Sequence, residues 1–131
     1  MNFAVEHLGL PARDPGVLAD WYVRNLSAEL LYADKETPPS YFVRLPGGVL
    51  LEIYLARLSY PETANNKLAG WRHVGLRVDS IAAAKSVLES RGMKFNSEID
   101  TAFAGGLVLY FADGEGNLLH LVERAPHLPL P

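Results

Sequence analysis

The sequence contains no cysteine, and this absence restricts the chemistry open to the chain. Disulfides, thiolate zinc sites and thiol nucleophiles are all excluded. The side chains left to bind a metal ion are those of His, Asp and Glu. Histidine is itself scarce, with four among 131 residues, so the positions of those four carry information.

The sequence also lacks an excess of positive charge and any long hydrophobic run. The formal net charge is −3 and the 12 Lys and Arg residues are scattered, which argues against a nucleic-acid partner. Every apolar stretch is interrupted well before it reaches the length of a membrane span, as Glu52 interrupts "GGVLLEIYLA". The opening "MNFAVEHLGL" has no basic segment of the secretory type. We therefore expect a cytoplasmic protein with no nucleic-acid and no membrane partner.

What the sequence does contain is an internal repeat. The stretch "EHLGL" at 6–10 returns as "RHVGL" at 72–76, and "PGGVLLEIYL" aligns with "GEGNLLHLVE". A chain of this length builds one compact core rather than two independent ones. We therefore expect one domain over residues 1–131, made of two related modules. The predicted limits are 2–55 for the first module, 71–124 for the second, 56–70 for the linker and 125–131 for the tail.

Each module has the pattern of a strand, a helix and three further strands. In the first, a β-favouring run over 2–10 precedes a helix with Asp14 as N-cap and Pro15 as its first residue. Helical spacing places Val17, Leu18, Trp21 and Leu26 on one side of this helix. Its later strands are predicted in "AELLYAD", "SYFVRL" and "VLLEIYL". In the second, "WRHVGLRV" precedes a helix in "DSIAAAKSVLESRG", and strands are predicted in "MKFNS", "GLVLYFAD" and "LLHLVER". The fold class expected is α+β, with two βαβββ modules.

The repeat places residues of metal-binding type at two equivalent positions. His7 is equivalent to His73, and Glu52 is equivalent to His120. A lone strand histidine is more often a hydrogen-bonded residue than a ligand, and strand alternation alone allows Glu52 on a solvated face. A carboxylate buried within "VLLEIYL" would instead need a cation or strong donors. Because all four positions pair, we favour a shared metal site; His127, in the tail, has no equivalent and is left out.

These motifs resemble the vicinal oxygen chelate superfamily, which groups glyoxalase I, extradiol dioxygenases, methylmalonyl-CoA epimerase, fosfomycin-resistance transferases and bleomycin-resistance proteins. The matching stretches are "HLGL" and "HVGL", "ADWYVRNL" at the end of the first helix, and "LLEIYL" and "FADGEGNLLHLVER". The resemblance covers roughly residues 2–124. It implies that the two modules form an open, incompletely closed barrel, the glyoxalase-like fold. Gly114 replaces a usual Pro, and His120 stands where glyoxalase-like members usually have Glu.

The resemblance implies a metal-dependent enzyme of glyoxalase-like type, a lyase or isomerase acting on a small oxygenated metabolite. The expected metal ligands are His7, Glu52, His73 and His120. Zn, Ni, Co, Fe and Mn all suit this donor set, and affinity order does not choose among them. The ion would stabilise an enediolate or other oxyanion formed by proton removal. Glu52 and His120 are the candidate catalytic residues that take the proton.

Two other functions stay open. An Fe(II) extradiol-type dioxygenase generally needs three open positions on a frame of two His and one carboxylate, which a fourth firm ligand opposes. A binding protein of the bleomycin-resistance type would sequester a small molecule without turnover.

Weaker expectations concern the pocket and the partner. Tyr54 shares a strand face with Glu52, and Arg77 shares one with His73, so both are candidates for lining a substrate pocket. An exposed Arg at a strand end is about as frequent without such a role. Relatives of this size commonly pair, so we expect a homodimer, with the site lying within one chain or between two.

Overall fold

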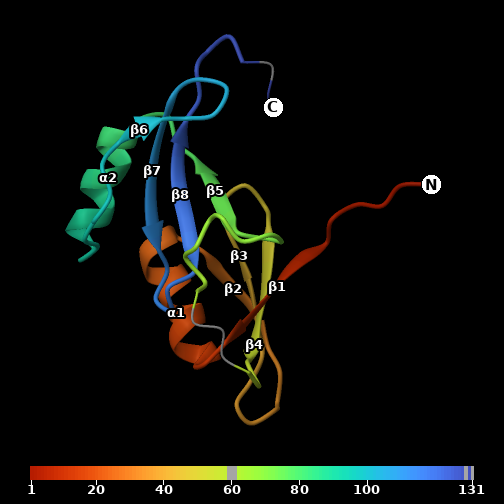
Figure 1. Ribbon diagram of the computed structural model, residues 1–131. Helices are drawn as coiled ribbons and strands as arrows, with labels where there is room; N and C mark the ends of the chain where they lie inside the picture. Colours follow the sequence, from red (N-terminus) through yellow and green to blue (C-terminus); the bar gives the residue numbers. More distant parts are fainter. Residues whose placement is uncertain (59–61, 129, 131) are drawn as a thin grey trace. The chain divides into compact units, whose positions relative to one another are not determined.

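The computed structural model describes residues 1–58, 62–128 and 130. It divides into two compact units, Met1–Pro61 and Glu62–Pro131, at a point inside the predicted linker. Within the described residues each unit has the order strand, helix, strand, strand, strand (Figure 1). The predicted α+β class and its two βαβββ modules are therefore confirmed. The parts of the predicted linker and tail at 59–61, 129 and 131 lie outside the described residues.

The first unit is a four-stranded mixed sheet with one helix. Its strands run in the order β1-β4-β3-β2, with β1 parallel to β4 and the other neighbours antiparallel. The parallel pairing places β1 beside β4, and these are the two strands that carry the predicted ligands His7 and Glu52. The elements are β1 (His7–Ala12), α1 (Pro15–Leu26), β2 (Glu29–Ala33), β3 (Tyr41–Arg44) and β4 (Leu50–Leu55).

Helix α1 begins and ends on local signals. The side chain of Asp14 accepts a hydrogen bond from the amide of Val17 at 3.1 Å, and Pro15 occupies the first turn as predicted. The helix ends at Leu26 and is capped by Ser27, which adopts the left-handed conformation with φ 57°. These contacts satisfy backbone groups that a helix terminus leaves unpaired.

One face of the sheet packs against α1. Leu18 and Tyr22 of the helix are buried, as are Val43, Leu51 and Ile53 on the strands beneath. Side chains alternate along each strand, so the residues between these buried ones face away from the helix. Glu52 lies between two of them and is therefore on the open face of the sheet.

The second unit repeats this arrangement. Its strands run in the order β5-β8-β7-β6, with β5 parallel to β8 and the other neighbours antiparallel. Leu119 and Leu121 are buried on the face toward α2, so His120 between them lies on the opposite face. The elements are β5 (His73–Arg77), α2 (Ile81–Ser90), β6 (Asp100–Thr101), β7 (Leu107–Ala112) and β8 (Leu118–Glu123).

Helix α2 is held at its N-terminus by two side chains. Ser80 accepts a hydrogen bond from the amide of Ala83 at 3.2 Å, and a carboxylate oxygen of Glu123 accepts one from the amide of Ile81 at 2.8 Å. Glu123 thus serves the helix and not the face that carries His120. Among the described residues, no helix combines the length and apolar character that a membrane span requires.

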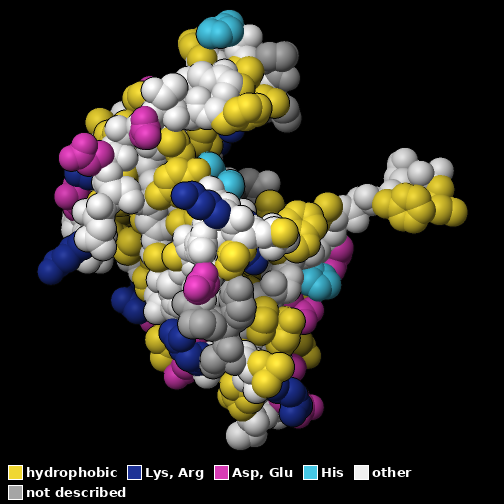
Figure 2. Space-filling model, viewed as in Figure 1, with side chains coloured by type: hydrophobic (Ala, Val, Ile, Leu, Met, Phe, Trp, Pro, Cys, Tyr) yellow, Lys and Arg dark blue, Asp and Glu magenta, His cyan; other side chains and the backbone are white. Residues whose placement is uncertain are grey.

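Three details of the sequence prediction are wrong. The first strand begins at His7 rather than at residue 2, because its partner begins opposite it at Leu50. The preceding segment 1–6 carries exposed apolar side chains, and Figure 2 shows apolar side chains at its outer end. The predicted helix face included Val17, whose side chain is 62% exposed. No strand forms in "MKFNS", where Phe95 packs its ring on Phe111 instead of pairing its backbone.

Candidate functional site

The first predicted pair, His7 and Glu52, meets on the open face of the first unit. Nε2 of His7 lies 3.3 Å from Oε2 of Glu52. Across the two strands it is Gly9 that stands in register with Glu52. Because Gly9 has no side chain, the imidazole reaches the carboxylate diagonally across the strand pair.

The other nitrogen of His7 also has an acidic partner. Nδ1 makes a short hydrogen bond with a carboxylate oxygen of Glu6. This bond raises the pKa of His7, and the negative charges of Glu6 and Glu52 act in the same direction against partial burial. Both carboxylates therefore favour a positive charge at this imidazole, which a proton or a metal ion provides.

The spacing of the pair fits two ligands of one ion. Ligand atoms about 2.1 Å from a metal and on neighbouring octahedral positions lie roughly 3 Å apart. The 3.3 Å between His7 and Glu52 is close to that value. Among the described residues of this unit, no third His, Asp or Glu joins the pair to complete a metal-binding group. The unit therefore holds two of the four predicted ligands.

The second predicted pair, His73 and His120, meets on the open face of the second unit. The centroids of the two imidazole rings lie 4.6 Å apart. Nδ1 of His73 is 2.8 Å from Oδ1 of Asn66. In a neutral His73, an Nδ1 that donates to this amide oxygen leaves the lone pair on Nε2, which is the form of histidine that binds metals.

His120 is held neutral by its surroundings. Burial lowers its pKa to about 4, and the charges of His73 and Arg124 act in the same direction. Its Nδ1 is buried and has no hydrogen-bond partner among the described residues. A neutral imidazole with a nitrogen that makes no hydrogen bond can act as a metal ligand.

Both units place an aromatic ring beside their histidine, a feature that the sequence analysis missed. Phe42 stands in register with Glu52, and Tyr110 stands in register with His120. Each ring packs edge to face with the first-strand histidine of its own unit, at centroid distances of 5.7 and 6.2 Å. Phe42 precedes Glu52 by the same number of positions as Tyr110 precedes His120. Extending the repeat alignment by one more strand would therefore have found the two aromatic residues.

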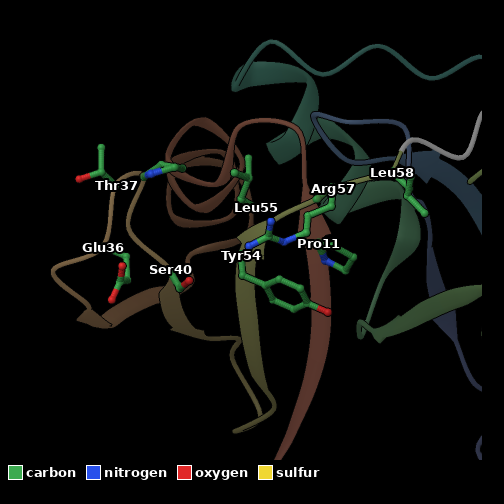
Figure 3. Close-up of a pocket in the computed structure, with 10 residues that line it drawn as sticks. Pro11, Glu36, Thr37, Ser40, Tyr54, Leu55, Arg57 and Leu58 are labelled. Atoms are coloured by element: carbon green, nitrogen blue, oxygen red, sulfur yellow. The ribbon is translucent and has the colours of Figure 1, made fainter.

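The first unit has two neighbouring pockets, of which the smaller reaches Glu52. The larger, of about 680 Å³, lies between the β2–β3 connection and the end of β4 (Figure 3). Tyr54, predicted as a pocket residue, lines it together with Pro11 and Arg57. The smaller, of about 240 Å³, is lined by Glu52 itself and shares Ser40 with the larger.

The other predicted pocket residue, Arg77, lies at the end of β5. It stands in register with Val122 and, by strand alternation, on the face that carries His73. The structure thus brings the four predicted ligands together as two pairs, one in each unit. Their union around a single ion stays a prediction.

Solved structures share this fold. A glyoxylase/bleomycin resistance protein/dioxygenase domain from Frankia sp. is 22% identical, with 98% of this chain and 96% of that chain covered and a TM-score of 0.74. A mutant of the fosfomycin resistance protein FosX from Listeria monocytogenes, complexed with Mn(II) and 1S,2S-dihydroxypropylphosphonic acid, is 16% identical, covering 96% and 94% with a TM-score of 0.69. The antibiotic binding protein TnmS3 from Streptomyces sp. is 22% identical, covering 95% and 98% with a TM-score of 0.70. The predicted glyoxalase-like fold is therefore confirmed.

The family follows from the sequence match. No curated protein matches the chain. Residues 4–121, which include both pairs and nearly the whole of each module, match the family model named Glyoxalase/Bleomycin resistance protein/Dioxygenase superfamily. The chain therefore belongs to the glyoxalase/bleomycin resistance protein/dioxygenase superfamily.

Proposed function

We propose that this chain is a metal-dependent enzyme of glyoxalase-like type, a lyase or isomerase that acts on a small oxygenated molecule. His7, Glu52, His73 and His120 would hold one divalent ion, with Zn, Ni, Co, Fe and Mn as the candidates. The single observation that carries the proposal is the 3.3 Å approach of Nε2 of His7 to Oε2 of Glu52.

The two groups can lie this close only with a metal ion between them or a proton on one of them. With Nδ1 engaged by Glu6, a neutral His7 would turn its Nε2 lone pair toward a carboxylate oxygen, and two acceptors would face each other. A metal ion relieves this repulsion and uses both lone pairs. A relative of the same fold is complexed with Mn(II) and a dihydroxy compound, which supports a divalent ion for this chain.

The proposed roles of the residues differ. An ion held by the four side chains would supply Lewis acidity toward a substrate oxygen. Glu52, half-buried at the wall of the smaller pocket, is placed to take a proton from a bound molecule. His120 is a weaker base than an ordinary histidine, because burial lowers its pKa to about 4, and we assign it the ligand role.

Metal analysis tests this centre. The full chain purified without added metal should contain about one equivalent of divalent ion per four-ligand site. His73→Ala and Glu52→Ala should each lose most of it, because each removes a donor from a different unit. His127→Ala is the matched control, since it removes a histidine that has no equivalent in the repeat. Retention of metal in both donor variants would refute the four-ligand centre.

A second candidate is sequestration without turnover. The pocket of about 680 Å³ is large enough for a drug-sized molecule, and one relative of the same fold is an antibiotic binding protein. Tight binding of a ligand that is recovered unchanged would favour this function. Oxygen uptake with catechols after Fe(II) loading would instead favour an extradiol-type dioxygenase.

We further propose that the two units act as one domain, since each supplies only two donors, and that the chain works in the cytoplasm as a homodimer. Light scattering on the eluting protein measures its mass directly. A mass of a single chain at micromolar concentration would contradict the dimer. Cell fractionation tests the location.

A further inference from the structure

The small pocket against Glu52 has walls of an unusual composition. Its volume is about 240 Å³, and the residues that line it are two acids, three aromatic residues and a serine. None of the described residues that line it is Lys or Arg. The lining residues are Tyr32, Asp34, Ser40, Tyr41, Phe42 and Glu52.

The second carboxylate, Asp34, is fixed in place by the backbone of the β2–β3 connection. Its Oδ1 accepts hydrogen bonds from the amides of Glu36 at 3.1 Å and Ser40 at 2.9 Å, and its own amide donates to the carbonyl of Ser40 at 3.0 Å. No ion pair within the described residues involves Asp34. Its negative charge is therefore held at the pocket wall without a cationic partner there.

The aromatic rings continue the wall toward the first histidine. Tyr32 and Phe42 stand in register on β2 and β3, and the Phe42 ring packs edge to face with His7 at 5.7 Å. A flat molecule in this pocket would lie against these rings, with its edge toward Glu52. Substituents on its other edge would meet Asp34.

We propose that this pocket receives a flat, hydroxyl-bearing ligand that is neutral or positively charged, and that Asp34 is the residue that excludes anions. The proposal rests on the proposed function, since Glu52, which lines the pocket, is one of the proposed metal ligands that the hydroxyl groups would approach. A fixed carboxylate accepts hydrogen bonds from hydroxyl or ammonium groups and repels a carboxylate or phosphonate. The chain should therefore differ in ligand preference from its relative that is complexed with a phosphonic acid.

A series of three probes tests the preference for charge. Catechol, dopamine and protocatechuate carry the same pair of neighbouring hydroxyls and are neutral, cationic and anionic at pH 7. Calorimetric titration of the Zn(II)-loaded full chain should give dopamine at least about tenfold higher affinity than protocatechuate, which is about 1.4 kcal/mol. In Asp34→Asn the ratio should fall about tenfold while the affinity for catechol stays within about twofold. Asn keeps the Oδ1 acceptor that the amides of Glu36 and Ser40 require, so the loop is preserved.

Asp20→Asn is the matched control. It changes the net charge by the same amount, but Asp20 lies on α1, pairs with Arg24 and is absent from the pocket wall. Its ratio of affinities should equal that of the unmodified chain. Equal binding of the three probes in Zn(II)-loaded protein, or an unchanged ratio in Asp34→Asn, would overturn the proposal and leave the metal centre standing.

Failure of the metal centre is distinguishable from failure of this proposal. If the chain binds no Zn(II), the proposed function is wrong, and the charge preference is then measured on metal-free protein with p-cresol, tyramine and 4-hydroxybenzoate. A preference for tyramine that Asp34→Asn removes would support the acidic pocket on its own. No preference among these three would overturn it.

Discussion

Gly75 on β5 and His120 on β8 stand opposite each other, and a Cβ at residue 75 would come within 2.6 Å of Nε2 of His120. Real Cβ atoms essentially never approach so closely, so the imidazole occupies room that only glycine leaves. The equivalent Gly9 also faces its last-strand residue, but the nearest atoms to a Cβ there belong to Tyr54, at 3.6 Å. The two glycines of the repeat therefore have different importance for the site.

We predict that Gly75→Ala displaces His120 without unfolding the second unit. The clash falls on the end of a side chain that can rotate, so the cost in unfolding free energy should be about 1–2 kcal/mol. Metal affinity should fall about tenfold or more, because one donor leaves its position. Urea unfolding and a metal titration measure the two effects separately.

Gly9→Ala serves as the control for that prediction. Its added methyl group meets ordinary van der Waals contact at 3.6 Å. Unfolding free energy should change by less than about 0.5 kcal/mol, as at most surface positions, and metal affinity should stay the same. Equal loss of metal from both alanine variants would mean that the contact between Gly75 and His120 is not what positions the imidazole.

We predict that Glu6→Gln weakens metal binding through His7. Gln keeps an oxygen that accepts from Nδ1 of His7 but removes the negative charge that makes the imidazole more basic. The pKa of His7 should fall toward its usual value in metal-free protein, and metal affinity should fall about tenfold. NMR titration of the imidazole and competition with a chelator give the two values. Glu29→Gln, which removes an exposed carboxylate paired with Arg44 in the same unit, should change neither.

The parts of this fold that the sequence predicts are those with local signals. Asp14 predicts the start of α1 as an N-cap and Pro15 as a first-turn residue, and the structure places both as expected. The meeting of His7 with Glu52 depends on the parallel pairing of β1 with β4, the first and last strands of the module, and the paired positions of the repeat indicated it. Repeat alignment then assigns His120 to the same position in the second module.

The parts that the sequence did not predict depend on register and on contacts distant in the chain. Phe42 and Asp34 join the pocket only because β3 pairs with β4 in one particular register and the β2–β3 connection folds back on itself. Phe95 lies in a segment with strand-like composition, yet its backbone pairs with no strand. Its ring packs on the ring of Phe111 instead. Val17 was assigned to the buried side of α1 because helical spacing alone does not mark the edges of the apolar stripe.

We predict that His120 makes the metal-free protein less stable as the pH falls from about 6.5 to 4. The pKa of His120 is about 4 in the folded chain, against 6.5 for an ordinary histidine. Between these pH values the unfolded chain binds a proton that the folded chain does not, so the free energy of unfolding decreases as the pH falls. Because the side chain is only partly buried, solvent screening limits the loss to about 1–2 kcal/mol.

Urea unfolding at several pH values, with a chelator present, measures how the free energy of unfolding changes with pH. His120→Gln should make this dependence on pH weaker. The comparison cancels the contribution of His7, whose raised pKa acts in the opposite sense. An unchanged slope in His120→Gln, with His127→Gln as the reference, would mean that His120 is not held neutral by the fold.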